Sequence, residues 1–314
     1  MRRERLTPAL IPRFLPSLRR ASTDHHRVVA DTICPICDGR SFRFLFIKNG
    51  RRFWECEECR VQQIIPLPSD EEVQQHYRAS YENGLYRTQL DTLGIHDRRA
   101  EERLEAVLPL CRPGRWLDVG CSEGDFVATA QRYGLDAEGI DLCEIAVARA
   151  RTKGLPVSCA SVSDLRPSLL YDTITAFDVI EHVRDPASFL TSIWSLLGQG
   201  GSLVLTTPDL SSWSRLVMRR RWYFYIPEEH LFHFRRDSLC RLLSRTRFDG
   251  VKVMSASKLV SYAYALDQLK EYNPLVHALA TRARALIPKA MVETPFPLHL
   301  GELLVIARKQ QDGA

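Results

Sequence analysis

The chain has 314 residues, of which 45% are hydrophobic and 26% are charged. These proportions are average for globular proteins, so they exclude collagen-like, low-complexity and wholly disordered chains. The net charge of +5 comes entirely from residues 1–30, because the rest of the chain carries equal numbers of acidic and basic side chains. This neutral balance argues against nucleic acid as a partner.

Residues 1–30 hold seven Arg against two acids. The segment lacks the apolar stretch of a secretory signal, and its prolines (Pro8, Pro12 and Pro16) would interrupt the amphipathic helix of a transit peptide. We therefore expect a disordered basic tail. The nine cysteines are an odd number and follow no signal, so they predict a reduced, cytoplasmic protein rather than a disulfide framework. No transmembrane segment is predicted, because the longest stretch without charge, residues 186–208, is interrupted by glycines and polar side chains.

Residues 31–68 contain two C-x-x-C motifs separated by 18 residues. Alternating strands at 42–46 and 52–55 with a turn at Asn49-Gly50 lie between the two motifs. Two knuckles joined by a hairpin predict a zinc ribbon, whereas a redox C-x-x-C is normally single. We expect a closed structural zinc held by four thiolates: Cys34, Cys37, Cys56 and Cys59.

Residues 69–112 are polar and helix-prone. Ser69 and Glu72 form a capping-box pattern, which predicts a helix from there to about Tyr77. We expect this segment to be a helical connector that covers an active site.

From Arg115 onward, short apolar runs alternate with helical patterns. We expect strands at 116–120, 136–141, 157–160, 172–178 and 202–206, and helices at 125–133, 144–153 and 187–197. A further helix is expected at 236–245 and strands at 251–254 and 300–307. Such alternation predicts an α/β fold with a parallel sheet covered on both faces, over residues 113–309, with a helical insertion at about 256–299.

The turn after the first of these strands carries the most specific motif. It has the form D-x-G-x-x-x-G, from Asp118 to Gly124, and Asp141 follows Gly120 by 21 residues. A glycine-rich turn and a ribose-binding acid indicate a cofactor that contains adenosine. The Asp118 carboxylate would repel a pyrophosphate but suits the ammonium and sulfonium of S-adenosylmethionine.

On these residues the chain resembles the class I S-adenosylmethionine-dependent methyltransferases, whose motif is D-x-G-x-G-x-G, with Ser122 in place of the middle glycine. Residues 160–165 look like the family's third motif, and residues 171–186 and 228–234 are similar to ubiquinone-type O-methyltransferases. The resemblance covers about residues 70–309 and implies a seven-stranded Rossmann-like sheet that is mostly parallel, with an antiparallel last strand. It also implies these cofactor-binding residues: Asp118, Gly120, Ser122, Gly124, Asp141, Leu142, Asp164, Leu165 and Phe177.

Methyl transfer needs an aligned acceptor and removal of its proton. Our first candidate for the base is His230 assisted by Glu229, because a Glu-His pair in this segment is implicated in zinc-containing sugar C-methyltransferases. The alternative is that His230 only shapes its loop.

Two other histidines have alternative assignments. Asp178, Glu181 and His182 match the E-x-x-E-H stretch that ubiquinone-type relatives associate with a divalent metal, although Glu-His there can simply begin a helix. His233 lies in an aromatic stretch, and we expect it to be structural.

Residues 213–225 mix arginines with aromatics. They could bind a substrate diphosphate, lie on a membrane surface or another subunit, or form a solvated helix end.

The sequence therefore predicts a methyltransferase that uses S-adenosylmethionine and acts on a small molecule, such as a nucleotide-linked or glycan sugar or a natural-product intermediate. The alternatives are a metal-assisted O-methyltransferase of a quinone-like or catechol-like acceptor, a NAD-dependent oxidoreductase, and a non-catalytic zinc-ribbon binding module. The methylated atom and the oligomeric state stay open.

Overall fold

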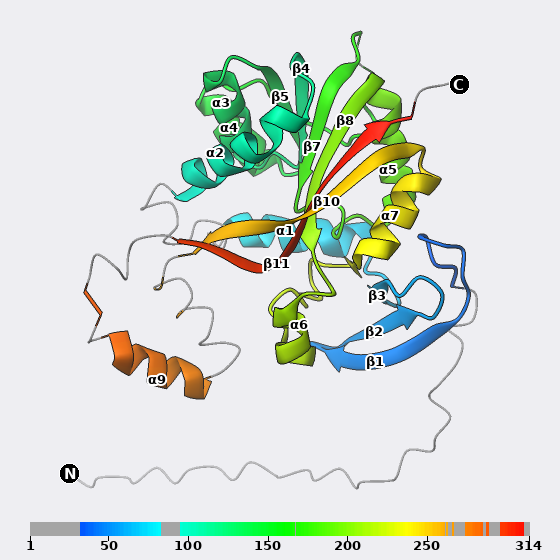
Figure 1. Cartoon of the computed structure of the whole chain (residues 1–314), viewed down its shortest axis with the longest axis vertical. Coiled ribbons are helices and arrows are strands. Elements are labelled where there is room, and N and C mark those ends of the chain that lie inside the picture. The colour runs from blue at the N-terminus through cyan, green and yellow to red at the C-terminus, as the bar shows by residue number, and fades with distance from the viewer. Residues whose placement is uncertain are drawn as a thin grey trace, which may run out of the picture.

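The computed structural model describes residues 32–82, 95–166, 168–260, 274–284 and 296–310, together with residues 262, 266, 287 and 288. Two sheets form the molecule, a large one above and a small one below in Figure 1, with helices around the large sheet. The basic tail, residues 83–94 of the connector and parts of the insertion at 256–299 lie outside the described residues. Within that insertion the described helix is α9 (Pro274–Arg284).

The large sheet has seven strands in the order β10-β11-β8-β7-β4-β5-β6. The first strand of this sheet along the chain is β4. The neighbouring strands among β4, β5, β6, β7 and β8 all pair in parallel, whereas β11 is antiparallel to both of its neighbours. This confirms the predicted α/β fold with an antiparallel last strand. The strands are β4 (Arg115–Val119), β5 (Asp136–Asp141), β6 (Val157–Cys159), β7 (Tyr171–Phe177), β8 (Leu197–Pro208), β10 (Phe248–Val260) and β11 (Phe296–Lys309).

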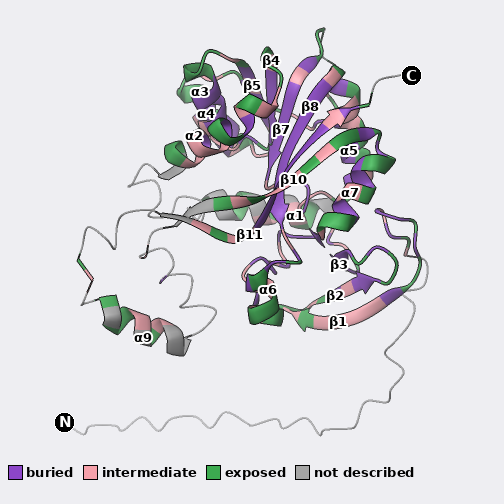
Figure 2. Cartoon of the chain, viewed as in Figure 1, coloured by how far each residue is buried: buried purple, intermediate pink, exposed green. Residues whose placement is uncertain are grey.

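Helices cover both faces of this sheet, and each face has its own apolar core (Figures 1 and 2). The central strands β4, β7 and β8 are largely buried because helices cover both of their faces. One face packs on α2 (Ile95–Val107), α3 (Asp125–Arg132) and α4 (Glu144–Thr152). The other face packs on α5 (Pro186–Leu196) and α7 (Arg236–Arg245).

The small sheet has the order β1-β2-β3-β9. Its hairpin joins β1 (Phe42–Lys48) to β2 (Arg51–Cys56) through Asn49 and Gly50, which both have the positive φ that a tight hairpin turn needs. The hairpin confirms the predicted strands. The sequence had not indicated β3 (Gln62–Ile64) or its antiparallel pairing with β9 (Phe232–His233), a strand from the second half of the chain. The ribbon therefore shares a sheet with the segment that follows β8.

The helix α1 (Asp70–Glu82) begins at the predicted capping box and is longer than expected, since it continues past Tyr77. The Ser69 amide donates to the Glu72 carboxylate at 2.8 Å, and the Glu72 amide donates to the Ser69 hydroxyl at 3.1 Å. Arg51 of β2 forms an ion pair with Glu72 at 2.9 Å. In Figure 1 α1 crosses the region between the two sheets.

A short helix, α6 (Trp213–Met218), follows β8 and continues into a 3-10 turn (Arg219–Arg221). The sequence pattern had left this segment without a definite structure. None of the described helices has the length and apolarity needed to cross a lipid bilayer.

Candidate active site

The turn between β4 and α3 has a strongly curved backbone. Gly120, Ser122 and Gly124 all have left-handed conformations, with φ of 74°, 51° and 83°. A Cβ on Gly120 would lie 2.5 Å from Cγ2 of Val179, and a Cβ on Gly124 would lie 2.6 Å from Cδ1 of Leu155. An alanine at either position would combine a close contact with an unfavourable left-handed conformation, whereas Ser122 adopts the third left-handed position with a side chain.

Asp141 ends β5 and anchors this turn. One of its carboxylate oxygens accepts the Ser122 amide and the other accepts the Cys143 amide, both at 2.8 Å. Burial raises the pKa of Asp141, and the two amide donors partly oppose that rise. Each oxygen keeps a second lone pair, so the carboxylate can also accept ribose hydroxyls.

Asp118 is buried below the same turn and accepts a hydrogen bond from the Thr175 hydroxyl at 2.6 Å. Burial raises the pKa of Asp118 to about 7, although the Thr175 bond and the charge of Arg103 oppose the rise. A bound cation would stabilise the ionised form of this carboxylate. The cradle therefore fits the positively charged S-adenosylmethionine, and Asp118, Gly120 and Asp141 are the residues that would hold it.

Arg103 of α2 reaches the carboxyl end of β7. Its guanidinium forms an ion pair with Asp178 and lies 4.7 Å above the centre of the Phe177 ring. The Thr206 hydroxyl donates to the other Asp178 oxygen at 2.7 Å. These contacts place the Arg103 guanidinium between the segment after β7 and the turn that joins β4 to α3, which we call the cofactor turn.

No local motif in the sequence points to Arg103. A signal was nevertheless present, because Ala100, Leu104 and Val107 form the buried face of α2 and Arg103 lies on the same face. An arginine at such a position needs a charged or aromatic partner, and here it has both.

The other predicted cofactor residues follow neighbouring strands. Leu142 comes directly after β5 and is largely exposed, and Asp164 is exposed in the turn after β6. Leu165 packs against the apolar core on the face of the sheet that α5 and α7 cover, and Phe177 ends β7. Because parallel strands end at the same edge of a sheet, the fold brings all nine predicted residues to one edge.

The segment that follows β7 meets the segment that leads into β9. The amides of Leu231 and Phe232 donate to the Glu181 carbonyl at 2.8 and 3.1 Å. The rings of His182 and His230 then lie edge to face, with centres 4.7 Å apart. The fold thus brings together the two histidines that the sequence had offered as separate candidates.

Glu181 completes a group of three potential metal donors. Donor atoms of Glu181, His182 and His230 all lie within 4.8 Å of one another. Burial raises the pKa of Glu181 well above its ordinary value, and the charge of Asp178 raises it further. The predicted donor Asp178 lies outside this group, and its carboxylate pairs with Arg103 instead.

His230 is buried and has a defined tautomer. Its Nδ1 lies 2.7 Å from the Phe224 carbonyl, which can only accept, so Nδ1 carries the proton. The neutral ring therefore has its lone pair on Nε2. Burial lowers the pKa of His182 well below its ordinary value.

Glu229 precedes His230 and points to the connector helix. Its carboxylate is buried and lies 3.1 Å from Nε2 of His76 on α1. No local motif in the sequence points to His76. This contact joins α1 to the segment that carries the predicted base.

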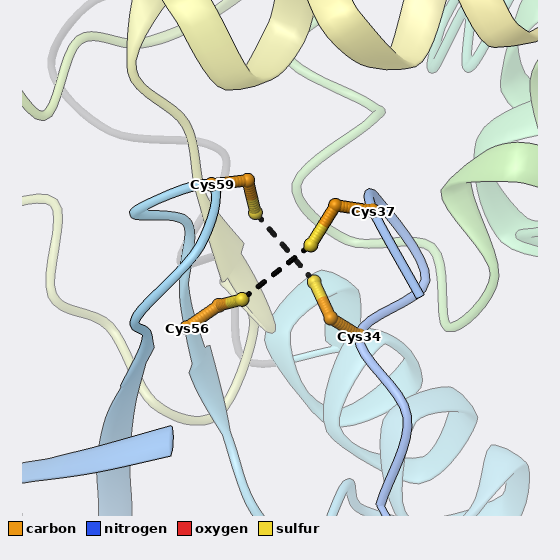
Figure 3. Close-up of side chains that lie close together, drawn as sticks. All are labelled: Cys34, Cys37, Cys56 and Cys59. Atoms are coloured by element: carbon orange, nitrogen blue, oxygen red, sulfur yellow. Dashed lines mark hydrogen bonds between the residues drawn. The ribbon is translucent and has the colours of Figure 1, made fainter. Parts of the chain in front are cut away.

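The four ribbon cysteines converge as predicted (Figure 3). The sulfur atoms are 3.6 Å apart in the pair Cys34–Cys59 and 3.5 Å apart in the pair Cys37–Cys56. Tetrahedral zinc with Zn–S bonds of about 2.3 Å needs sulfurs about 3.8 Å apart, so the four thiols fit a structural zinc.

A buried hydrogen-bond network connects the ribbon to His230. The Gln62 amide donates to Glu55 at 3.0 Å, and the Tyr225 hydroxyl donates to the Gln62 oxygen at 2.6 Å. The carbonyl of Phe224, next to Tyr225, accepts the Nδ1 proton of His230.

His233 also donates to the Phe224 carbonyl, through Nε2 at 3.0 Å. Its ring is fully buried against Phe53 and Tyr225, and burial lowers its pKa to about 3. These contacts agree with the structural role expected for His233.

Comparison with known proteins identifies the family. A methyltransferase domain family matches residues 93–253, just over half of the chain. The ubiquinone biosynthesis O-methyltransferase of Methylococcus capsulatus is 34% identical over 104 residues, which are 30% of this chain and 44% of that protein. The enzyme of the same name from Albidiferax ferrireducens is 26% identical over 191 residues, 55% of this chain and 70% of that protein. The match thus spans less than half of the first relative.

Solved structures agree with the fold. The magnesium protoporphyrin IX methyltransferase of Synechocystis PCC 6803, solved with bound S-adenosylhomocysteine, has a TM-score of 0.50 at 12% identity and covers 77% of this chain and 100% of that chain. A Haloferax volcanii methyltransferase complex with the Trm112 activator gives a TM-score of 0.51 at 15% identity, covering 78% of this chain and 100% of that chain. The chain therefore belongs to the methyltransferase domain family, and it has the fold of an S-adenosylmethionine-dependent methyltransferase.

Proposed function

We propose that this protein transfers a methyl group from S-adenosylmethionine to a small-molecule acceptor. The observation that carries the proposal is the turn after β4, where two left-handed glycines follow the buried Asp118 carboxylate and Asp141 anchors the turn. A NAD-dependent oxidoreductase would place a pyrophosphate beside that carboxylate, which is electrostatically unfavourable. The intact turn also argues against a purely non-catalytic binding module.

Bound S-adenosylmethionine supplies an electrophilic methyl group on a sulfonium. The chain must hold the acceptor in line with that group and remove the acceptor proton. His230 is suited to accept this proton, because its Nδ1 is committed to the Phe224 carbonyl and its Nε2 carries the lone pair. Glu229, which His76 holds in place, then provides a carboxylate beside the acceptor.

The acceptor class is supported by the architecture. The zinc ribbon contributes three strands to the sheet that carries His233 and lies next to His230. A ribbon in this place is a feature that the chain shares with the sugar C-methyltransferases it resembles. We therefore favour a nucleotide-linked or glycan sugar as the acceptor.

A metal-assisted O-methylation is the second candidate, because one observation favours it. Glu181, His182 and His230 offer three donor atoms within 4.8 Å, and one Glu181 oxygen is buried with no hydrogen-bond partner among the described residues. A divalent metal there would lower the pKa of an acceptor hydroxyl. The site would then favour a catechol-like acceptor over a sugar.

Calorimetric titration with S-adenosylhomocysteine tests the cofactor. We expect saturable binding by the full chain, and at least a tenfold loss in Asp118→Asn. Asp237→Asn is the matched control, since Asp237 is exposed on α7. Absence of binding by the unaltered chain would contradict the proposal.

The acceptor is tested by radiolabelled methyl transfer to a panel of nucleotide-linked sugars and catechols. His230→Ala should abolish turnover while S-adenosylhomocysteine still binds. Loss of turnover on chelation of a second metal would favour the catechol alternative. Full turnover by His230→Ala would exclude His230 as the base.

A further inference from the structure

The segment after β8 places three large apolar side chains on one exposed helical face. In α6, Trp213, Leu216 and Val217 occupy positions i, i+3 and i+4, and their side chains are 59%, 61% and 73% exposed. Figure 2 shows this helix largely in the colour of exposed residues, at the edge of the molecule. Large exposed apolar clusters are uncommon on monomeric surfaces and usually mark an interaction site.

A cluster of positive charge continues directly from this apolar face. Arg219, Arg220 and Arg221 form the 3-10 turn after α6, and all three are exposed. The charge is local rather than general, because residues 31–314 have no net charge. The combination of an apolar face, a tryptophan and adjacent arginines is typical of segments that lie in the interface of a lipid bilayer.

The segment is held rigidly in this exposed position. The Trp213 indole donates to the His299 carbonyl at 3.2 Å, and Ser214 donates to the Leu300 carbonyl at 2.7 Å, so α6 is attached to β11. Met218 packs against the buried cluster that contains Trp222. The apolar side chains therefore remain at the surface although their helix is anchored, which a partner must explain.

We propose that α6 and its arginine turn form a peripheral membrane-binding patch that docks on bilayers with anionic headgroups. The apolar face would insert among the headgroups, and the arginines would lie against their phosphates. The patch begins five residues after β8 ends, at the same sheet edge as the candidate active site. Docking would therefore orient the active-site side of the molecule toward the bilayer surface.

Vesicle sedimentation of the full chain tests the proposal. The probes are vesicles of phosphatidylcholine alone and vesicles in which about a third of the lipid is phosphatidylglycerol. We expect binding to the anionic vesicles, and much weaker binding to the neutral ones. Each arginine at an anionic surface is worth about fivefold in partitioning, so R219Q/R220Q/R221Q should weaken binding on the order of a hundredfold.

The apolar variant W213S/L216S/V217S should remove the binding that persists at high salt, where electrostatic attraction is screened. Every variant keeps residues 1–30, so the basic tail contributes equally to all of them. Matched controls are L169S/L170S, a second exposed apolar pair, and R98Q/R236Q/R241Q, three exposed arginines elsewhere. Both controls should bind like the unaltered chain.

The proposal is overturned if the unaltered chain does not sediment with anionic vesicles, or if the patch variants bind as well as the controls. Gel filtration with light scattering supplies a separate outcome. A dimer that W213S/L216S/V217S converts to a monomer would assign the patch to a second copy of the chain instead. Neither result depends on S-adenosylhomocysteine binding, which is measured in parallel to show that each variant is folded.

Discussion

The buried carboxyl of Asp118 makes stability depend on pH. Its pKa is raised to about 7 by burial, so between pH 4 and pH 7 the folded state holds a proton that the unfolded state has released. Without ligand, this group therefore stabilises the fold at low pH, and its contribution is lost as pH rises through 7. Asp118→Asn removes the charge and should be more stable than the unaltered chain at pH 8, by a few kcal/mol at most.

Urea denaturation at pH 5 and pH 8 measures this effect. The stability difference between Asp118→Asn and the unaltered chain should be smaller at pH 5 than at pH 8, because most of the interval between the unfolded and folded pKa values lies above pH 5. Asp237→Asn provides the control, because this exposed carboxylate has no buried charge to remove. A difference that is equal at both pH values would show that the Asp118 carboxyl is not desolvated.

Gly120 of the cofactor turn and Gly134 are both left-handed glycines, but they differ in their contacts. Gly120→Ala places a methyl group 2.5 Å from the Val179 side chain at a φ of 74°, and should cost about 3 kcal/mol of stability together with cofactor binding. Gly134→Ala has a similar φ of 82° but no heavy atom within 4 Å, so it should cost only about 1 kcal/mol. Thermal unfolding compares the two, and equal costs would mean that the Val179 contact is unimportant.

At this scale, the sequence could predict the cofactor turn because the motif is local. Asp118 to Gly124 are consecutive, and their chemistry needs no knowledge of distant packing. Arg103 and His76 could not be found in this way, since their partners Asp178 and Glu229 are 75 and 153 residues away. The same limitation explains why Asp178 was grouped with Glu181, although tertiary packing directs it to Arg103.

The small sheet joins the ribbon to the segment that carries His230, and the buried network between them can be tested. Tyr225→Phe removes the hydroxyl that donates to Gln62 at 2.6 Å and leaves a buried acceptor unsatisfied. We expect a loss of about 1–3 kcal/mol in the free energy of unfolding. Tyr133→Phe is the matched control, because its hydroxyl bonds to Glu105 at an exposed site, and it should stay within about 0.5 kcal/mol.

The strands of the large sheet could be predicted from their alternation with helices, whereas two short strands of the small sheet could not. The strands and helices of the large sheet were predicted because strand-like and helix-like segments alternate along the chain, and the observed β5 matches its expected bounds. The strands β3 and β9 have three and two residues, too few for any periodicity. They form only because distant segments of the chain pair with each other. The sequence alone therefore does not show that the ribbon and the segment after β8 share a sheet.

For the whole molecule, the two sheets should respond differently to loss of the ribbon metal. The cofactor turn belongs to the large sheet, whereas the chain around His230 is tied to the ribbon through β9 and the Gln62–Tyr225 bond. Structural zinc contributes directly to the folding energy of a small ribbon. Cys56→Ser should therefore loosen residues 224–234 while S-adenosylhomocysteine binding changes less than about threefold.

Hydrogen exchange and calorimetry distinguish these two responses. Faster exchange at residues 224–234 with intact S-adenosylhomocysteine binding would mean that the ribbon supports the acceptor side alone. Cys159→Ser is the control, since Cys159 is exposed at the end of β6, far in the sheet order from the ribbon pairing. Loss of cofactor binding in Cys56→Ser but not in Cys159→Ser would instead show that the two sheets unfold as one cooperative unit. The structure provides a reason for such coupling, because one apolar core contains residues of both sheets, among them Cys34 and Ala307.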